Sequence, residues 1–159
     1  MDDKLFCTPI GRFRTWEDGP RLELDPACRE ALAGLEGFSH IQILWWFSGC
    51  DDPVSRETLT VQRPYRKGPE TLGVFATRSP QRPNPIALSC AQMTYLDREA
   101  GIVGLAYMDA DDNTPVLDIK PYTPSLDRVE LPALPEWCAH WPQNYETSGD
   151  FPWEEEFNF

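Results

Sequence analysis

Short stretches of alternating apolar and polar residues recur along most of the chain. Alternation of this kind places every second side chain on one face, as in a half-buried β-strand. It predicts strands over residues 6–14, 21–24, 58–62, 86–96, 101–108 and 116–119. The stretch 38–47 alternates at first and then becomes continuously apolar, which is typical of a central strand covered on both faces.

Helical periodicity is scarce by comparison. Asp25-Pro26 resembles a helix start, with an N-cap residue followed by proline at the first helical position. The helix would continue through residues 28–35 and end at Gly34 or Gly37, whereas the polar stretch 48–56 is expected to be a loop. One short helix among seven or so short strands indicates an all-β barrel or an α+β domain rich in strands.

The last part of the chain differs in composition. Residues 131–159 contain no lysine or arginine, although they carry acidic residues and the tryptophans Trp137, Trp141 and Trp153. Disordered segments usually lack aromatic residues. We therefore predict a β domain over residues 1–130 and an acidic tail, residues 131–159, that docks on this body or on a partner subunit.

A proline-rich stretch, residues 73–89, holds the most distinctive side chains. It begins with the apolar residues 74–76, which are expected to form a strand, and then contains Pro80, Pro83 and Pro85. Each proline fixes its own φ and restricts the residue before it, so Arg78 and Arg82 project from a stiff, extended loop. Such a loop holds polar groups in place before a ligand arrives, although a structural loop with solvated arginines is the alternative.

A second polar cluster lies near residue 113. Asp111, Asp112 and Asn113 are expected to form a tight turn, in which asparagine tolerates left-handed φ. A strand follows over residues 116–119, and period two places Asp118 and Lys120 on one of its faces. A solvated acidic turn is the simpler interpretation of the two aspartates, but the neighbouring charged pair favours a binding site.

Charge and cysteine content exclude several classes of protein. The net charge of −12 argues against a broad nucleic-acid groove, although residues 56–85 hold six basic and only two acidic residues. Such a basic island fits one anionic ligand or a restricted phosphate contact. Five cysteines without a Cys-x-x-Cys pair argue against a zinc site and a disulfide framework. No metal is expected, and the lack of a membrane-length apolar run and of a signal-peptide core predicts a cytoplasmic protein.

Three blocks of sequence together carry a family resemblance. They are residues 34–47, residues 73–89 and residues 114–122, which read GLEGFSHIQILWWF, GVFATRSPQRPNPIALS and TPVLDIKPY. In order and spacing they resemble the TsaA/TrmO (YaeB-like) family of S-adenosylmethionine-dependent tRNA methyltransferases. The resemblance implies a small antiparallel β-barrel that forms a homodimer, with the cofactor close to the subunit boundary. It also implies methyl transfer to N6 of threonylcarbamoyl-adenosine beside the anticodon.

The resemblance assigns roles by matched position. The implied contacts to S-adenosylmethionine are Ser48, Gly49, Arg78, Leu88, Asp112, Asn113, Thr114 and Pro115. The implied polar cluster beside the transferred methyl group is Asp118, Lys120 and Tyr122, with Asp118 as the candidate base. Arg82 and Asn84 of the proline-rich loop are candidate substrate contacts.

Four departures from the family pattern leave the function open. Asn113 replaces a glycine, Ser48-Gly49 replaces His-Gln, residues 15–19 are shorter, and an acidic tail stands in place of an RNA-binding extension. The acceptor is therefore tRNA or a small molecule, and the net charge favours the small or non-tRNA acceptor. The alternative function is a non-catalytic module that binds S-adenosylmethionine or a nucleotide.

Overall fold

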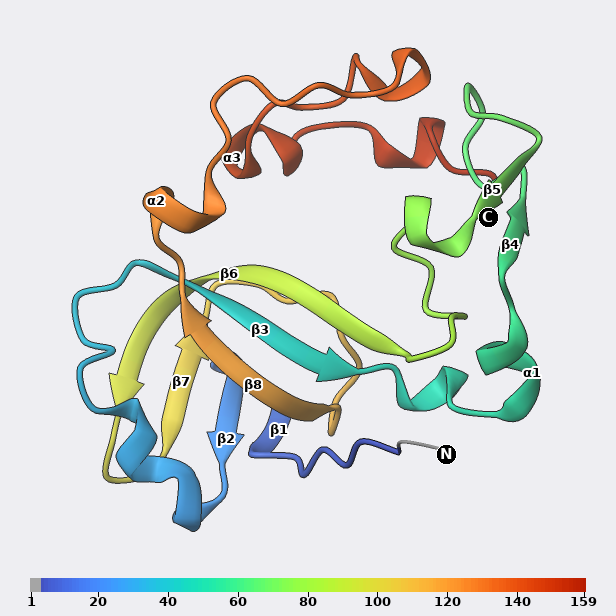
Figure 1. Cartoon of the computed structure of the whole chain (residues 1–159). Helices are drawn as coiled ribbons and strands as arrows, with labels where there is room; N and C mark the ends of the chain where they lie inside the picture. The colour runs from blue at the N-terminus through green and yellow to red at the C-terminus, as the bar shows by residue number, and fades with distance from the viewer. Residues whose placement is uncertain (1–3) are drawn as a thin grey trace.

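The computed structural model describes residues 4–159, and its main feature is a closed, six-stranded antiparallel barrel (Figure 1). The barrel strands are β1 (Gly11–Trp16), β2 (Gly19–Leu24), β3 (His40–Trp46), β6 (Ile86–Asp97), β7 (Ile102–Leu105) and β8 (Pro115–Pro121). Their order around the barrel is β1-β2-β7-β6-β3-β8, and the pairing of β8 with β1 closes the sheet. The predicted mostly β fold and antiparallel barrel are confirmed.

Alternation along the strands builds the barrel core. The barrel side chains that expose at most 1% of their surface are Phe13, Leu22, Ile41, Ile43, Ala91, Val103 and Val116, and each of the six strands supplies at least one of them. Burial of each of the larger side chains in this set contributes about 1.5–3 kcal/mol to folding. Strand β3 also buries Trp45, whereas the next residue, Trp46, points outward, so the two tryptophans lie on opposite faces.

The predicted helix is present but differs in type. Residues Pro26–Leu32 form the 3-10 helix η1, and Asp25 makes no side-chain hydrogen bond to it. The helix ends before Gly34, which has a φ of +86°, while Gly37 has a φ of +91°. The two glycines therefore change the direction of the chain after the helix. The expected aspartate cap is wrong, because the Asp25 carboxylate accepts no hydrogen bond from the N–H groups of this helix.

The prediction of a strand over residues 74–76 is also wrong. The strand lies just before, as β5 (Thr71–Gly73), and pairs with β4 (Thr60–Gln62) in a separate two-stranded sheet. Residues Val74–Ala76 form the 3-10 helix η3, in which Thr77 N donates to Val74 O at 3.1 Å. A short apolar run has no periodicity that separates a strand from a helical turn, and here the turn buries Val74.

The polar stretch expected to be a loop contains two short helices, η2 (Ser48–Cys50) and α1 (Pro53–Glu57). Asp52 caps α1, because its carboxylate accepts hydrogen bonds from Ser55 N at 3.0 Å and Ser55 Oγ at 2.6 Å. These bonds keep the pKa of Asp52 below its usual value. Asp52 followed by Pro53 is the sequence pattern that indicates the start of α1, with an N-cap residue before a proline at the first helical position.

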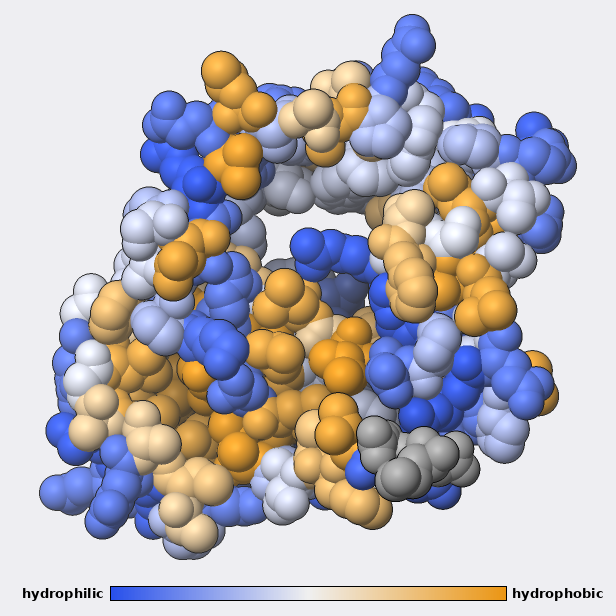
Figure 2. Space-filling view, in the orientation of Figure 1, coloured by the Kyte–Doolittle hydropathy of each residue, from blue (hydrophilic) through white to orange (hydrophobic). Residues whose placement is uncertain are grey.

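The C-terminal tail, residues 131–159, leaves the barrel beyond β8 and returns to the β4–β5 sheet (Figure 1). Four short helices lie on this path after β8, namely α2 (Pro124–Asp127), η4 (Glu136–Cys138), α3 (Tyr145–Ser148) and η5 (Trp153–Glu155). An isolated bridge joins Phe157 to Tyr65, close to the end of the chain. Figure 2 shows an opening between the tail and the barrel.

Among residues 4–159, no helix is both long enough and apolar enough to cross a membrane. The same residues bring together no group of three or more His, Cys, Asp or Glu side chains that could hold a metal ion. All five cysteines are free thiols, and burial raises the pKa of Cys90 and of Cys138.

Candidate functional site

Three segments expected to contact the cofactor meet at the C-terminal end of β3. Trp45 pairs with Ala87 of β6 on one side and with Val116 of β8 on the other. Neighbouring strands lie about 4.8 Å apart, so the first residues of β6 and β8 are about 10 Å apart. Helix η2, with Ser48 and Gly49, begins only two residues after β3 ends. Strand pairing thus gathers segments that are far apart in sequence.

Two of the expected cofactor contacts bond directly to each other. Arg78 donates from Nη1 to the carbonyl oxygen of Leu88 at 3.0 Å, which ties the proline-rich loop to β6. Arg78 is exposed, and Leu88 exposes 47% of its surface. The remaining N–H groups of the guanidinium can therefore reach an anionic ligand beside an apolar side chain.

Arg82 lies in the same loop but has internal partners. Its guanidinium donates to the carbonyl oxygens of Ser79 at 3.1 Å and of Thr77 and Val74 at 3.4 Å each. These bonds satisfy carbonyl groups that the loop leaves without a strand partner, so Arg82 holds the loop in shape. Its predicted contact with a substrate stays a prediction.

The acidic turn closes the barrel. Asn113 has a φ of +67°, as expected for this position, and Asn113 N donates to Phe13 O at 2.8 Å. The Asp112 carboxylate accepts a hydrogen bond from Thr15 N at 2.9 Å and lies 3.5 Å from the Arg14 guanidinium. The Thr15 bond, followed by the Arg14 charge, keeps the pKa of Asp112 below its usual value. The Asp112 carboxylate is therefore ionised, and its contacts with Thr15 and Arg14 hold it against β1.

Asp118 and Lys120 form an ion pair on the outer face of β8, with Nζ and Oδ2 2.8 Å apart. Hydrogen bonding to Asp118 raises the pKa of Lys120, so the lysine stays protonated beside that carboxylate. Leu44 of β3 pairs with Asp118 on one side and with Leu88 on the other. Because paired residues face the same side of a sheet, the candidate base and a candidate cofactor contact share one row.

Tyr122 is not part of that row. Its backbone N donates to His40 O at 3.0 Å, and its ring lies edge-on to the His40 ring with 6.3 Å between centroids. Tyr122 is four residues beyond Asp118, and at about 3.3 Å per residue the two backbones are about 13 Å apart. Of the predicted catalytic residues, the barrel thus brings together Asp118 and Lys120 but leaves Tyr122 at the opposite end of β3.

Residues 7–128 match the family described as the tRNA-methyltransferase O (TrmO) N-terminal domain. The chain belongs to this family. The resemblance that we drew from the three sequence blocks is thereby confirmed.

Similar proteins differ in length and in the function that their names give. An S-adenosyl-L-methionine-binding protein of Archaeoglobus fulgidus is 35% identical, covering 79% of this chain and 94% of its own length. The tRNA (adenine(37)-N6)-methyltransferase of Escherichia coli is 38% identical, covering 72% of this chain but 47% of its own length. A probable S-adenosyl-L-methionine-binding protein of Archaeoglobus fulgidus is 36% identical, and the match covers 30% of it. This chain thus spans less than half of two of these three relatives.

Solved structures lead to the same family. The crystal structure of TrmO from Pseudomonas aeruginosa is 34% identical and superposes with a TM-score of 0.60. The match covers 79% of this chain and 59% of that one. A second TrmO structure is 35% identical with a TM-score of 0.61.

The candidate site has neighbours that sequence reasoning missed. Asn84 Oδ1 lies 3.4 Å from a nitrogen of Arg56, which also pairs with Asp51 at 2.8 Å and lies over the Trp46 ring. Arg56 therefore links helix α1 to the proline-rich loop. In the sequence, Arg56 is distinguished only as one of the six basic residues within 56–85. Its role could not be predicted, because residues 48–56 were expected to form a loop rather than helix α1.

Proposed function

We propose that this TrmO-family chain is an S-adenosylmethionine-dependent methyltransferase that acts on N6 of threonylcarbamoyl-adenosine, a modified nucleoside beside the anticodon of tRNA. The observation that supports this proposal most directly is the row of paired residues Leu88, Leu44 and Asp118 across three neighbouring strands. This row puts a carboxylate next to the segments that meet at the end of β3. The name of the Escherichia coli relative supports the acceptor. Such a function belongs in the cytoplasm.

The residues at the end of β3 fit the chemistry of the cofactor. S-adenosylmethionine combines a sulfonium cation, a carboxylate and an apolar adenine face. The ionised Asp112 adds negative charge that Arg14, at 3.5 Å, offsets only in part. The Arg78 N–H groups that do not bond to Leu88 suit a carboxylate, and the Leu88 side chain offers an apolar surface. Bound there, the cofactor would supply an activated methyl group.

The chain's own contribution to the reaction is placement and proton removal. Methyl transfer is a displacement in which holding both reactants in line supplies much of the rate. When N6 of the acceptor bonds to the methyl carbon, the bond between that carbon and the sulfonium sulfur would break and leave a neutral thioether. N6 must then lose its proton, which the Asp118 carboxylate would take. Ile119 N donates to Asp118 Oδ1 at 2.9 Å, and Lys120 bonds to Oδ2 at 2.8 Å, so the carboxylate is oriented before the acceptor arrives.

Transfer of tritiated methyl groups to bulk tRNA lacking this modification tests the proposal. A general base contributes about 10²–10⁴-fold, so Asp118→Asn should lower transfer by about 100-fold or more. Binding of S-adenosylmethionine, measured by calorimetry, should remain unchanged in this variant. Asp109→Asn removes an exposed carboxylate elsewhere and serves as the matched control. Equal transfer by Asp118→Asn and the unaltered chain would exclude the proposed base.

The same assay separates the alternative functions. Several archaeal relatives are named only as S-adenosyl-L-methionine-binding proteins, which favours a non-catalytic binding module as the second candidate. Calorimetric binding without transfer to tRNA or to a small-metabolite extract would establish that module. Transfer to the extract alone would identify a small-molecule methyltransferase.

We also propose that two copies form a homodimer through the outer face near the start of β6. Ile86 and Leu88 expose 37% and 47% of their surface there, and Phe75 of η3, which precedes the loop that leads into β6, exposes 81%. Exposed apolar side chains that lie together are typical of protein interfaces. Phe75→Glu should shift the mass in sedimentation equilibrium from dimer to monomer, whereas Leu5→Glu should not. A monomeric unaltered chain would contradict the homodimer.

A further inference from the structure

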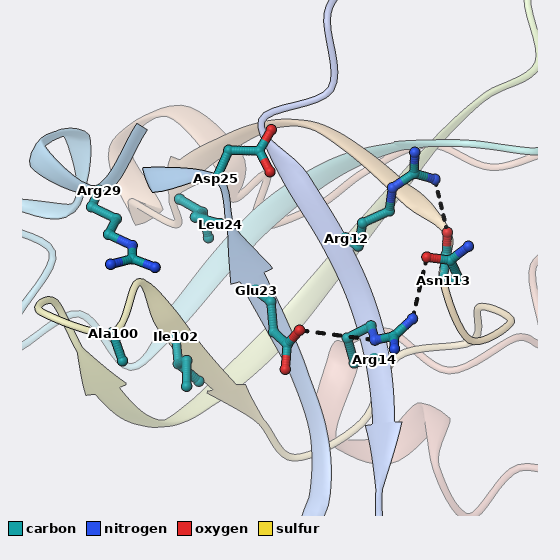
Figure 3. Close-up of a pocket in the computed structure, with 9 residues that line it drawn as sticks. All are labelled: Arg12, Arg14, Glu23, Leu24, Asp25, Arg29, Ala100, Ile102 and Asn113. Carbon is teal, nitrogen blue, oxygen red and sulfur yellow. Dashed lines mark hydrogen bonds and ion pairs between the residues drawn. The ribbon is translucent and has the colours of Figure 1, made fainter. Parts of the chain in front are cut away.

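The hollow between β1, β2 and the β6–β7 turn holds arginines that bond to the turns of the barrel itself. Arg12 and Arg14 donate to the backbone oxygen and to Oδ1 of Asn113, at 3.1 and 3.2 Å. Arg29 donates to Glu99 O at 3.0 Å. Figure 3 shows the guanidiniums of Arg12 and Arg29 at opposite ends of this hollow and pointing apart, so they do not converge on one ligand. The outer face of β3 is arranged differently.

The tail, residues 131–159, is attached to the rest of the chain at two places, and an opening remains between the tail and the barrel (Figure 2). At one end of the tail the Tyr145 ring of α3 lies edge-on to His40, with 5.5 Å between ring centroids. At the other end the tail contacts Tyr65. Because His40 is the first residue of β3, the outer face of this strand runs from α3 toward the cofactor segments at its C-terminal end (Figure 1).

Gln42 lies two residues after His40 on β3 and faces outward with it. The strand alternates partly buried and buried residues, and Gln42 belongs to the partly buried, outward set. Within residues 4–159 its side-chain amide makes no hydrogen bond and is not sealed from solvent. Its neighbours already have partners, since Lys120 pairs with Asp118 at 2.8 Å and His40 Nδ1 lies 2.8 Å from Ser39 Oγ. Gln42 therefore offers an uncommitted donor and acceptor on this face.

The position of Gln42 is one row away from the candidate base. Gln42 pairs with Cys90 of β6 and with Lys120 of β8, whereas Asp118 pairs with Leu44, two residues farther along β3. Diagonal neighbours of this kind have Cβ atoms about 7–8 Å apart, a distance that long side chains span. The Gln42 amide and the Asp118 carboxylate can therefore contact neighbouring atoms of one ligand.

The Cys90 side of this row lies close to α2 and α3. Burial, followed by the carboxylates of Asp127 in α2 and Glu146 in α3, raises the pKa of the Cys90 thiol. Negative charge at this place disfavours a phosphate group and leaves a neutral, flat group as the suitable ligand. Helix α3 also lies beyond the residues 7–128 that match the family, so this surrounding belongs to the present chain.

A free amide beside a carboxylate matches one edge of an adenine. Glutamine can donate to adenine N7, and the N6 group lies next to N7 on the same edge. We propose that Gln42 recognises the acceptor base, with its side-chain amide donating to N7 while Asp118 faces N6. This inference rests on the proposed function, because it takes an adenosine as the acceptor and Asp118 as its base. It adds a side chain that selects a purine and holds N6 toward the carboxylate.

Binding of two synthetic anticodon stem–loop RNAs tests the inference without requiring turnover. One carries N6-threonylcarbamoyladenosine at the acceptor position, and the other carries the same nucleoside with a carbon in place of N7. Both are titrated by fluorescence anisotropy with saturating S-adenosylhomocysteine, the demethylated cofactor. A neutral hydrogen bond changes affinity about three- to tenfold, so the unaltered chain should prefer the first RNA by that factor. Gln42→Leu should bind both RNAs equally, whereas Gln62→Leu, at an exposed glutamine of β4, should keep the preference.

A preference that survives in Gln42→Leu, or the lack of any preference in the unaltered chain, overturns the inference. Calorimetry with S-adenosylmethionine gives a second readout, in which Gln42→Leu should bind as the unaltered chain does. Loss of this binding with the RNA preference retained would assign Gln42 to the adenine of the cofactor and overturn the inference. If the leucine variant loses both, Gln42→Glu decides, because it keeps the shape of the side chain and removes only the N–H donor.

The tritium assay for methyl transfer separates this inference from the proposed function. Transfer to tRNA together with an N7 preference that does not depend on Gln42 contradicts the inference alone. A preference that depends on Gln42 without any transfer contradicts the methyltransferase function and leaves Gln42 as a contact to a bound purine. Binding of neither RNA contradicts both.

Discussion

The barrel and the C-terminal tail are held in place by different interactions. Barrel strands join through a closed set of backbone hydrogen bonds around an aliphatic core. The tail, residues 131–159, forms no strand; apart from a short backbone bridge at Phe157, it packs aromatic side chains against the loop that follows β4. Backbone pairing makes the strands of a barrel depend on one another, whereas side-chain contacts can open locally. The comparison predicts that the two regions lose their structure separately.

Tyr65 is the centre of the tail contact. Its ring stacks on Trp137 with 5.1 Å between centroids and meets Trp141 edge-on at 5.2 Å and Phe157 at 5.8 Å. Each aromatic pair contributes about 0.5–1.5 kcal/mol beyond the burial of surface area. Arg66 adds bonds from its guanidinium to the carbonyl oxygens of Phe157 and Glu154, at 3.2 and 3.1 Å.

A buried carboxylate completes this contact. Glu156 exposes 6% of its surface and lies 2.7 Å from His140 Nε2, and Trp141 Nε1 donates to it at 3.2 Å. The loop that carries Tyr65 leads through β5 into the proline-rich stretch with Arg78. Loss of the tail should therefore disturb the loop beside the cofactor before it disturbs the barrel.

The largest expected effect is in the barrel core. Ile43→Ala removes a side chain that is fully buried on β3 and leaves a cavity, which should lower the free energy of unfolding by about 3 kcal/mol. Urea denaturation followed by far-UV circular dichroism measures this change. Leu44→Ala, on the outward face of the same strand, is the control and should cost much less. Equal costs for the two variants would contradict the inward assignment of Ile43.

A smaller and more local effect is expected in the tail. Tyr65→Ala removes three ring contacts from a half-buried cluster, which should destabilise tail docking by about 2 kcal/mol. Limited proteolysis should then cut within residues 131–159, while the urea midpoint of the barrel stays close to that of the unaltered chain. Tyr107→Ala, at a tyrosine that exposes 64% of its surface, should leave the tail protected. Simultaneous loss of barrel and tail would show that the two regions form one cooperative unit.

The turn that closes the barrel offers a test of backbone conformation. Asn113 has a φ of +67°, where a residue with an ordinary Cβ costs about 1 kcal/mol. Asn113→Ala should therefore lower barrel stability by about 1 kcal/mol, whereas Asn113→Gly should be close to neutral. Thermal unfolding of the two variants gives the comparison. A glycine variant as unstable as the alanine variant would assign the effect to the Arg14 hydrogen bond to Asn113 Oδ1 at 3.2 Å instead.

The smallest expected effect is a pH dependence of tail docking. The hydrogen bond with His140, followed by that from Trp141, keeps the pKa of Glu156 below its usual value. A group whose pKa is lower in the folded state stabilises it above the unfolded value of about 4.3, and this contribution is lost as pH falls through the folded value. Tryptophan fluorescence of the tail should therefore change below about pH 4.3.

Glu156→Gln removes the titrating group and should flatten this acid transition, while Asp150→Asn, at an exposed aspartate, should leave it in place. An unchanged transition in Glu156→Gln would assign it to other carboxyl groups. The experiment thus asks whether one buried carboxylate links the tail to the loop that carries Tyr65.

Local features of the site were accessible from the sequence. Asn113 is suited to left-handed φ, the spacing of Asp118 and Lys120 puts them on one face, and alternation in β3 separates Trp45 from Trp46. Each of these depends on a residue's own conformational preference or on the period of a strand. The conformation of residues 74–76 could not be obtained in this way, because three apolar residues fit a strand and a helical turn equally well.

The sequence by itself determined which residues share a face, where the chain turns and which family it resembles, because these depend on local periodicity and on motifs. Only the tertiary structure decided which strands are neighbours. Pairing of Trp45 with both Ala87 and Val116 gathers the cofactor segments. The same packing turned Arg82 toward the carbonyl groups of its own loop. Such contacts join residues far apart in sequence or depend on the final path of a loop, and strand periodicity carries no information about either.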